Sequence, residues 1–227
     1  MRRILLVMFF MDLRLNIVAS NAAQHGRNKI GEGIKVLAEV YYDSSYNKKP
    51  KSRTSSEHGT NKNSEDPFQD HFEQLLKKVE KRFNQQNVSI KIELAKVTQV
   101  TNITVPYQMS LMSIDGQKTL YNLRNYSMYL GAPNNTVHFL YTKKDIYEYS
   151  DRGDRMPLVL HDVETYRTFC TNNVSAAVVS DKSKSWDYMY SVKALASTFG
   201  CLRHTRFFKP DFDTMEETFR HCHGSNT

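Results

Sequence analysis

Apolar side chains recur at helical spacing along residues 68–83 of this 227-residue chain. Their positions follow i, i+4, i+7, i+8, i+11 and i+15, which places them on one face of a helix. They are Phe68, Phe72, Leu75, Leu76, Val79 and Phe83. Asp66 and Pro67 stand just before them, and an N-cap acid followed by proline at the first helical position is a start signal. The pattern predicts a long amphipathic helix that begins at Pro67.

Alternating apolar and polar residues follow this helix. The alternation covers residues 88–95 and is typical of a half-buried strand. Residues 137–142 predict another strand. Between the two, residues 101–130 mix aromatic side chains, two N-glycosylation sequons and a turn at Asp115-Gly116. We expect a loop with a short helix there.

Two further helices are predicted near the C-terminus. One runs over residues 185–200 and ends at Gly200, since glycine commonly follows a helix. Its apolar face consists of Met189, Val192, Leu195, Ala196 and Phe199. The other occupies residues 213–220 and is capped by Asp213. A chain of this length can bury a sizeable core, so we expect one domain over residues 29–227.

Residues 192–204, VKALASTFGCLRH, keep the spacing of a zinc-protease motif without its ligands. In H-E-x-x-H-x-x-G-x-x-H, three histidines hold Zn²⁺ and the glutamate activates a water molecule. When the motif glycine is aligned with Gly200, the positions of its three histidines are occupied by Lys193, Ser197 and Arg203. The position of the glutamate is occupied by Ala194. An ammonium, a hydroxyl and a guanidinium do not bind zinc, and alanine cannot act as a general base. The motif therefore predicts a protein without catalytic residues at these positions.

The segments before the motif carry a family resemblance. Residues 168–181, TFCTNNVSAAVVSD, resemble the segment before the zinc helix in reprolysin-like (adamalysin-type) metzincins, especially the tick salivary metalloproteases. Residues 32–43 are similar to the first strand of that catalytic domain. The resemblance covers residues 29–204 and implies an α/β, metzincin-like fold with a mixed twisted sheet, a long first helix and a former active-site helix. The family's methionine turn is missing, which implies a truncated C-terminal subdomain.

A replacement metal site is the main alternative to a lost one. Near the C-terminus a C-x-x-H pair and an H-C-H triplet offer side chains that bind zinc, namely Cys201, His204, His221, Cys222 and His223. We favour a disulfide together with surface histidines. We therefore expect no bound cofactor, although the family that this chain resembles binds zinc.

The N-terminus and the sequons predict a secreted glycoprotein. Residues 1–22 combine basic residues, an apolar run and small residues, as a signal peptide does. Five N-x-S/T sequons follow, and such sites are glycosylated in secreted proteins. Their asparagines are Asn87, Asn102, Asn125, Asn134 and Asn173.

The chain has three cysteines, Cys170, Cys201 and Cys222. In an oxidising compartment two of them should pair. The resemblance to the family implies that Cys170 pairs with Cys222. Cys201 would then be free or bonded to a second chain.

The net charge of +7 is partly local. Several of the basic residues lie in residues 47–65, a polar stretch that predicts a flexible surface loop. No nucleic-acid-binding motif accompanies them, so we exclude nucleic acid as a partner. After residue 22 no stretch approaches the roughly 18 apolar residues of a membrane span. Arg152-Gly153-Asp154 is interpreted as an ordinary turn, with integrin binding as the alternative.

Three functional hypotheses differ in class. The favoured one is a secreted, glycosylated, catalytically inactive homologue of a zinc metalloendopeptidase that binds a host or extracellular protein as a decoy, inhibitor or adhesion ligand. The second is an active secreted zinc metalloendopeptidase with a non-standard metal site. The third is a small-ligand-binding salivary protein of unrelated fold. The sequence sets no oligomeric state.

Overall fold

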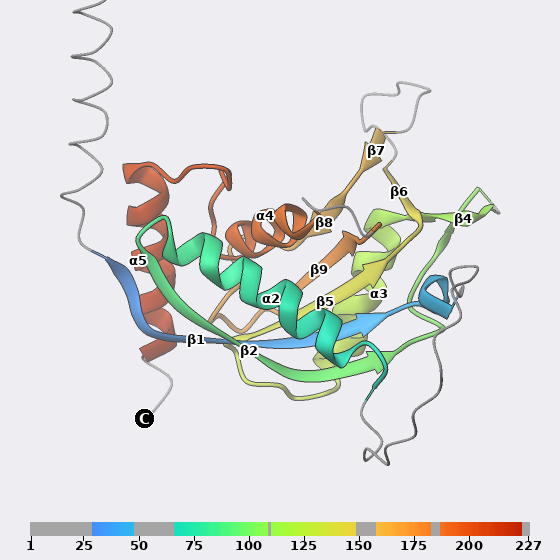
Figure 1. The fold of residues 1–227 in the computed structure, drawn as a ribbon, viewed down its shortest axis with the longest axis horizontal. Helices are drawn as coiled ribbons and strands as arrows, with labels where there is room; N and C mark the ends of the chain where they lie inside the picture. The colour runs from blue at the N-terminus through green and yellow to red at the C-terminus, as the bar shows by residue number, and fades with distance from the viewer. Residues whose placement is uncertain (1–28, 48–65, 109, 149–157, 183–186, 224–227) are drawn as a thin grey trace, which may run out of the picture.

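The computed structural model describes residues 29–47, 66–108, 110–148, 158–182 and 187–223 (Figure 1). The predicted signal peptide, nearly all of the predicted polar loop and the Arg152-Gly153-Asp154 turn lie outside these residues. Within the described part, no helix is both long enough and apolar enough to cross a membrane.

A five-stranded mixed sheet lies at the centre of the domain (Figure 1). Its strands, in spatial order, are β2 (Val88–Gln99), β1 (Ile30–Tyr42), β5 (Thr136–Thr142), β9 (Ser175–Ser180) and β8 (Asp162–Glu164). The first four are parallel, and β8 is an antiparallel edge strand. The mixed α/β fold and the strands predicted at residues 88–95 and 137–142 are thereby confirmed.

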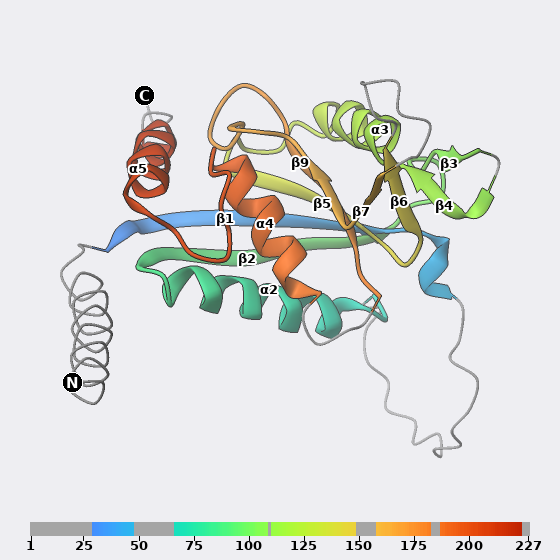
Figure 2. The same ribbon diagram turned by 90° about the horizontal axis from the view of Figure 1, so that it is seen from above.

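Helices pack on both faces of this sheet. The apolar faces of α2 (Gln69–Asn84) and α4 (Tyr188–Thr198) share one core, and α3 (Gly116–Met128) packs into a second core. Figure 2 shows α2 and α3 on opposite sides of the strands. Alternation along β5 explains the two cores: Phe139 and Tyr141 belong to the first, and Leu140 between them belongs to the second.

The predicted start of α2 is wrong by two residues. The helix begins at Gln69, and Asp66 is not its N-cap. Instead, Oδ1 of Asp66 accepts a hydrogen bond from the backbone N–H of Phe68 at 2.9 Å, which forms a turn before the helix. Oδ2 of Asp66 accepts a hydrogen bond from the hydroxyl of Tyr42, so this residue ties the helix entry to the end of β1.

Residues 101–130 contain the predicted helix but more regular structure than the predicted loop with a short helix. They form β3 (Pro106–Tyr107), β4 (Ser110–Asp115) and α3, and the two strands join β6 (Asp145–Glu148) and β7 (Leu158–Leu160) in a second, four-stranded sheet. The predicted turn at Asp115-Gly116 is the start of α3, where Oδ1 of Asp115 accepts a hydrogen bond from Lys118 N at 3.0 Å. A Cβ atom at Gly116 would lie 2.7 Å from Ile146 Cγ2, so glycine allows the helix to approach β6 closely.

The C-terminal helix α5 (Lys209–His223) also begins earlier than predicted. Asp213 is exposed in its second turn, and Asp211 accepts a hydrogen bond from Phe208 N at 2.9 Å instead. Phe219 packs against Phe199 with ring centroids 5.1 Å apart. A disulfide joins Cys170 to Cys222, the pairing that the family resemblance implied, and so links α5 to the segment before β9.

Candidate functional site

The motif-like segment, residues 192–204, lies on α4 and in the turn that follows it. The helix ends at Thr198, and Gly200 adopts a positive φ of +91°. A Cβ atom there would lie 2.9 Å from Thr214 Cγ2 and 3.1 Å from Arg167 Cγ, so both backbone conformation and space favour glycine. Leu195 and Ala196 are fully buried against the sheet. The scaffold of the motif is therefore part of the core.

The first ligand position is filled by a salt bridge. Lys193 Nζ lies 2.9 Å from Oδ1 of Asp162 and 3.9 Å from Oε1 of Glu164. Both acids stand on edge strand β8, and residues i and i+2 of a strand share a face. Two carboxylates from β8 and one ammonium from α4 thus meet where the motif would carry its first histidine.

Burial makes these carboxyl groups hard to ionise. It raises the pKa of Asp162, and the neighbouring Lys193 ammonium opposes that rise. The pKa of Glu164 is raised by burial and by the charge of Asp162, while Lys193 and a hydrogen bond from Ser197 oppose the rise. Oδ2 of Asp162 is buried without a donor partner in the described residues. A proton shared between the two carboxyl groups would supply that partner.

Of the remaining motif positions, Ser197 joins this cluster through its hydrogen bond to Glu164, and Arg203 and Ala194 do not. Arg203, at the third ligand position, points its guanidinium to Asp211 at 3.5 Å and lies over the ring of Phe208, 5.3 Å from its centroid. His204 is half-buried, and its pKa is lowered by burial and by Lys193, with Glu164 opposing. Ala194 is fully buried and has no polar side-chain atom.

The residues at the motif do not fit a zinc ion. Two of the three ligand positions carry cations, and zinc sites are built from cysteine, histidine and carboxylate side chains. Among the described residues, no three such side chains gather closely enough to hold a metal ion.

The residues predicted for a replacement metal site also have separate structural roles. Cys201 is buried, His221 is exposed on α5, and Cys222 is committed to the disulfide. The side chain of His223 lies outside the described part of the structure.

Cys201 is expected to be unreactive in the folded protein. Its side chain is 3% exposed, its Sγ donates a hydrogen bond to the carbonyl of Asp211, and burial raises the pKa of the thiol to about 12. Because the thiolate is the reactive form, iodoacetamide at pH 8 should leave the native chain unlabelled and should label one thiol per chain in denaturant. Mass spectrometry measures both. Rapid labelling of the native chain would contradict this burial, whereas the absence of labelling in denaturant without reductant would indicate a disulfide to a second chain.

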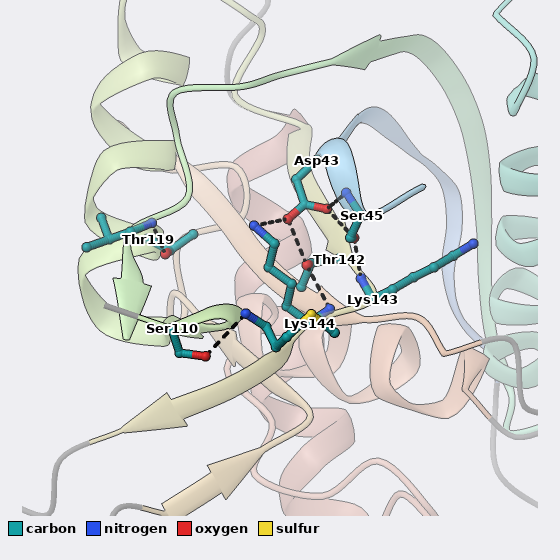
Figure 3. Close-up of polar contacts among 9 residues, drawn as sticks. Asp43, Ser45, Ser110, Thr119, Thr142, Lys143 and Lys144 are labelled. Atoms are coloured by element: carbon teal, nitrogen blue, oxygen red, sulfur yellow. Dashed lines mark hydrogen bonds and ion pairs between the residues drawn. The ribbon is translucent and has the colours of Figure 1, made fainter. Parts of the chain in front are cut away.

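A second polar cluster lies at the carboxyl ends of the parallel strands. Figure 3 shows the carboxylate of Asp43, which follows β1, among Ser45, Thr142 and Lys144. Its oxygens accept hydrogen bonds from Ser45 N and Thr142 Oγ1, each at 3.0 Å, and Lys144 Nζ lies 3.2 Å away. The carboxylate is fully satisfied by groups from both strand ends, so it holds β1 and β5 together.

Asp181, which follows β9, anchors the neighbouring part of this edge. Its Oδ2 accepts a hydrogen bond from Tyr46 OH and lies 2.7 Å from His71 Nε2. The side chain of His71 is 41% exposed and that of Asp181 is 3% exposed. The histidine therefore contacts both the buried acid and solvent.

Sequence reasoning singled out none of these acids. A usable signal existed, because each of Asp43 and Asp181 directly follows a buried parallel strand and such ends meet at one edge of a sheet.

The five sequon asparagines all lie in the described part, and none is buried. Asn102 and Asn173 are exposed, while Asn125 lies on α3. Asn87 adopts a positive φ of 63°, and its carbonyl accepts a hydrogen bond from Ile30 N. Asn102 and Asn173 are therefore the most accessible of the five, and Asn87, Asn125 and Asn134 are half-buried.

Comparison with protein-family models finds no match, and comparison with curated protein sequences finds none. Among solved structures, the fold is similar to the crystal structure of archaemetzincin from Methanopyrus kandleri, with a TM-score of 0.44 and 13% sequence identity. The similarity covers 82% of this chain and 96% of that chain.

Proposed function

We propose that this chain is a secreted, glycosylated and catalytically inactive homologue of reprolysin-like zinc metalloendopeptidases, and that it acts by binding an extracellular or host protein. The observation that carries the proposal is the Lys193 ammonium, 2.9 Å from Asp162, at the position of the first metal ligand. A divalent cation there would face a fixed positive charge. Hydrolysis would also lack its base, since residue 194 is a buried alanine.

The two carboxyl groups of β8 do not restore a hydrolase. Paired carboxyls that share a proton can act as acid and base. Here the side chain of Asp162 is 4% exposed and that of Glu164 is 12% exposed, and Lys193 neutralises the pair from the adjacent helix. A substrate carbonyl could not reach them without opening the contact between α4 and β8. The cluster is therefore structural, and the outer surface is left for binding.

The surface beside the motif has the composition of a protein-binding site. Exposed aromatic side chains and one leucine stand there with two arginines, and aromatic residues and arginine are enriched at interfaces. They are Tyr166, Leu202, Arg203, Arg206 and Phe208. Both guanidinium groups lie over the Phe208 ring, within 5.6 Å of its centroid, and Tyr166 OH donates to Gly200 O. These contacts hold the side chains in place before any partner arrives.

Metal content tests the loss of catalysis. Purified protein is expected to hold far less than one zinc per chain and to show no chelator-sensitive cleavage of gelatin or fibrinogen. The variant with Lys193→His, Ala194→Glu, Ser197→His and Arg203→His should gain zinc affinity if the scaffold is metzincin-like, while Lys193→Met alone should not. About one tightly held zinc per wild-type chain with chelator-sensitive cleavage would establish the second hypothesis, an active enzyme with a non-standard site.

The binding role is tested separately, by capture from plasma or extracellular matrix. A bait with Leu202→Asp and Phe208→Asp should lose a partner that the wild-type chain retains. A bait with Tyr129→Asp is the matched control, because Tyr129 is 85% exposed at the end of α3, away from the motif. Equal capture by all three baits would exclude the surface beside the motif as the binding site.

A further inference from the structure

Basic side chains gather where the end of α2 meets the connection between α4 and α5 (Figure 2). Arg82 donates a hydrogen bond to Thr205 O. Gln86 accepts one from Phe207 N at 2.9 Å and donates one to His204 O at 3.4 Å. The two segments therefore form one surface, which we call the basic patch. Its cations are Lys78, Lys81 and Arg82 from α2, and Arg203, Arg206 and Lys209 from the connection and the start of α5.

The charge of the basic patch is mostly uncompensated. Arg82 is half-buried, and the other five side chains are exposed. Among the described residues, a carboxylate pairs only with Arg203 of this patch, at 3.5 Å from Asp211. Asp213 lies one turn beyond Lys209 on α5, and within the same part of the chain the two form no ion pair. By contrast, several lysines elsewhere lie within 4.0 Å of a carboxylate, namely Lys35, Lys77, Lys91, Lys118, Lys144, Lys182 and Lys193.

Two of these cations stand where they add little to the stability of the fold. Lys209 is the first residue of α5, where the helix dipole disfavours a positive charge. The guanidinium of Arg206 lies 5.6 Å from the ring centroid of Phe208, and that of Arg203 lies 5.3 Å from the same centroid. Contact with a ring restricts a guanidinium without neutralising it. Arg206 is therefore held at the surface with its charge available to an anion.

The spacing of the cations makes the basic patch a strip. Arg203, Arg206 and Lys209 follow one another at intervals of three residues, and Lys78 and Arg82 lie four residues apart on one side of α2. A single carboxylate or phosphate would meet only one or two of them. A linear chain with many anionic groups would meet cations from both segments and would release the counterions of each.

The composition of the strip favours a polysaccharide over a protein. Half of its cations are lysines, a residue that is depleted at protein interfaces, whereas clusters of lysine and arginine are typical of heparin-binding surfaces. We propose that the basic patch binds a sulfated polysaccharide of the extracellular matrix. The place of this encounter rests on the secretion within the proposed function, whereas the binding itself does not.

Calorimetric titration of the purified full-length chain with heparin, at about 0.15 M salt, tests the proposal. Saturable binding is expected, and its affinity should fall steeply as salt is added. The variants Lys78→Gln/Lys81→Gln and Arg206→Gln/Lys209→Gln should each bind about tenfold more weakly. Each should also reduce the slope of log affinity against log salt by up to about two, because two cations no longer release counterions.

The matched control is Lys96→Gln/Arg124→Gln. Both side chains are exposed, and neither has a carboxylate partner within the described residues. Lys96 stands on β2 beyond the middle of the strand, and Arg124 stands on α3, on the opposite side of the sheet from α2 (Figure 2). The control loses the same net charge and should bind heparin like the wild-type chain. All the substituted side chains are exposed, so circular dichroism should show unchanged folding in each variant.

Three results would overturn the proposal. They are the absence of saturable heparin binding, equal weakening by the control and the patch variants, and equally tight binding of desulfated heparin, poly-L-glutamate or duplex DNA. The last would show that the chain attracts any polyanion, or that its partner is an acidic protein or a nucleic acid.

The proposed capture of a protein partner can fail separately. Lys78 and Lys81 lie outside the surface beside the motif, so Lys78→Gln/Lys81→Gln should lose heparin affinity and still capture the protein that the wild-type chain retains. A chain that captures no protein but binds heparin through these two lysines would contradict the proposed function and support the polysaccharide site.

Discussion

Replacing Lys193 with methionine is expected to destabilise the protein at pH 8 much more than at pH 4.5. The change keeps the aliphatic stem and removes the ammonium that lies between Asp162 and Glu164. Breaking a buried ion pair costs about 3–5 kcal/mol because a charge is left uncompensated. Lys193 is 39% exposed and partly solvated, so we expect a smaller loss, about 2 kcal/mol at pH 8.

The sign of the pH dependence follows from the carboxyl groups. Burial already raises the pKa of Asp162 and of Glu164 in the folded state, and removing Lys193 raises both further. The folded variant then holds its protons more tightly than the unfolded chain. Its stability therefore falls as the pH rises from the ordinary carboxyl pKa, near 4, through the raised folded values. Urea unfolding followed by circular dichroism at pH 4.5 and pH 8 measures the difference.

The matched control is Lys77→Met on the exposed face of α2. Lys77 lies 3.9 Å from Glu73 and is 76% exposed, so its loss should cost at most about 0.5 kcal/mol at either pH. In the background of Lys193→Met, the changes Asp162→Asn and Glu164→Gln should remove the pH dependence. If Lys193→Met and Lys77→Met behave alike at both pH values, the salt bridge does not stabilise the fold.

The longest elements of the fold could be predicted because one of their faces is buried. In α2 the apolar spacing extends over four turns, and in β2 it extends over eight alternating residues. Each pattern is long enough to indicate both the type of element and which of its faces is buried. The second sheet gave no such signal. Its strands β3 and β7 have two and three residues, too few to show alternation. The start of α3 was hidden because Asp-Gly is equally typical of a turn.

The candidate site could be predicted only in part, for a different reason. Motif spacing located Lys193, Ser197 and Arg203 because those positions follow from fixed separations along the chain. Their partners are set by tertiary structure: Asp162 and Glu164 lie about thirty residues earlier, on an edge strand of three residues. The raised pKa values depend on burial at that contact, which no local pattern records.

Contacts within the protein fix α4 to the rest of the fold. Phe199 contacts the rings of Phe83 and Phe169, with centroids 5.7 and 4.8 Å away, and Leu195 is fully buried. These contacts stabilise the helix from its apolar side. On the polar side, Lys193 and the acids of β8 provide the cross-link between helix and sheet.

Removing the disulfide is expected to lower the free energy of unfolding by about 4 kcal/mol. Cys170 and Cys222 are 52 residues apart, and a cross-link across a loop of that length restricts the unfolded chain by roughly this amount. Cys170→Ser/Cys222→Ser should show the loss in urea unfolding, and reduction of the wild-type chain should reproduce it. Hydrogen exchange should rise most in α5, because only non-covalent contacts, among them those of Met215 and Phe219, then hold it to the core. A loss below about 1 kcal/mol would mean that the unfolded chain is already compact around these two segments.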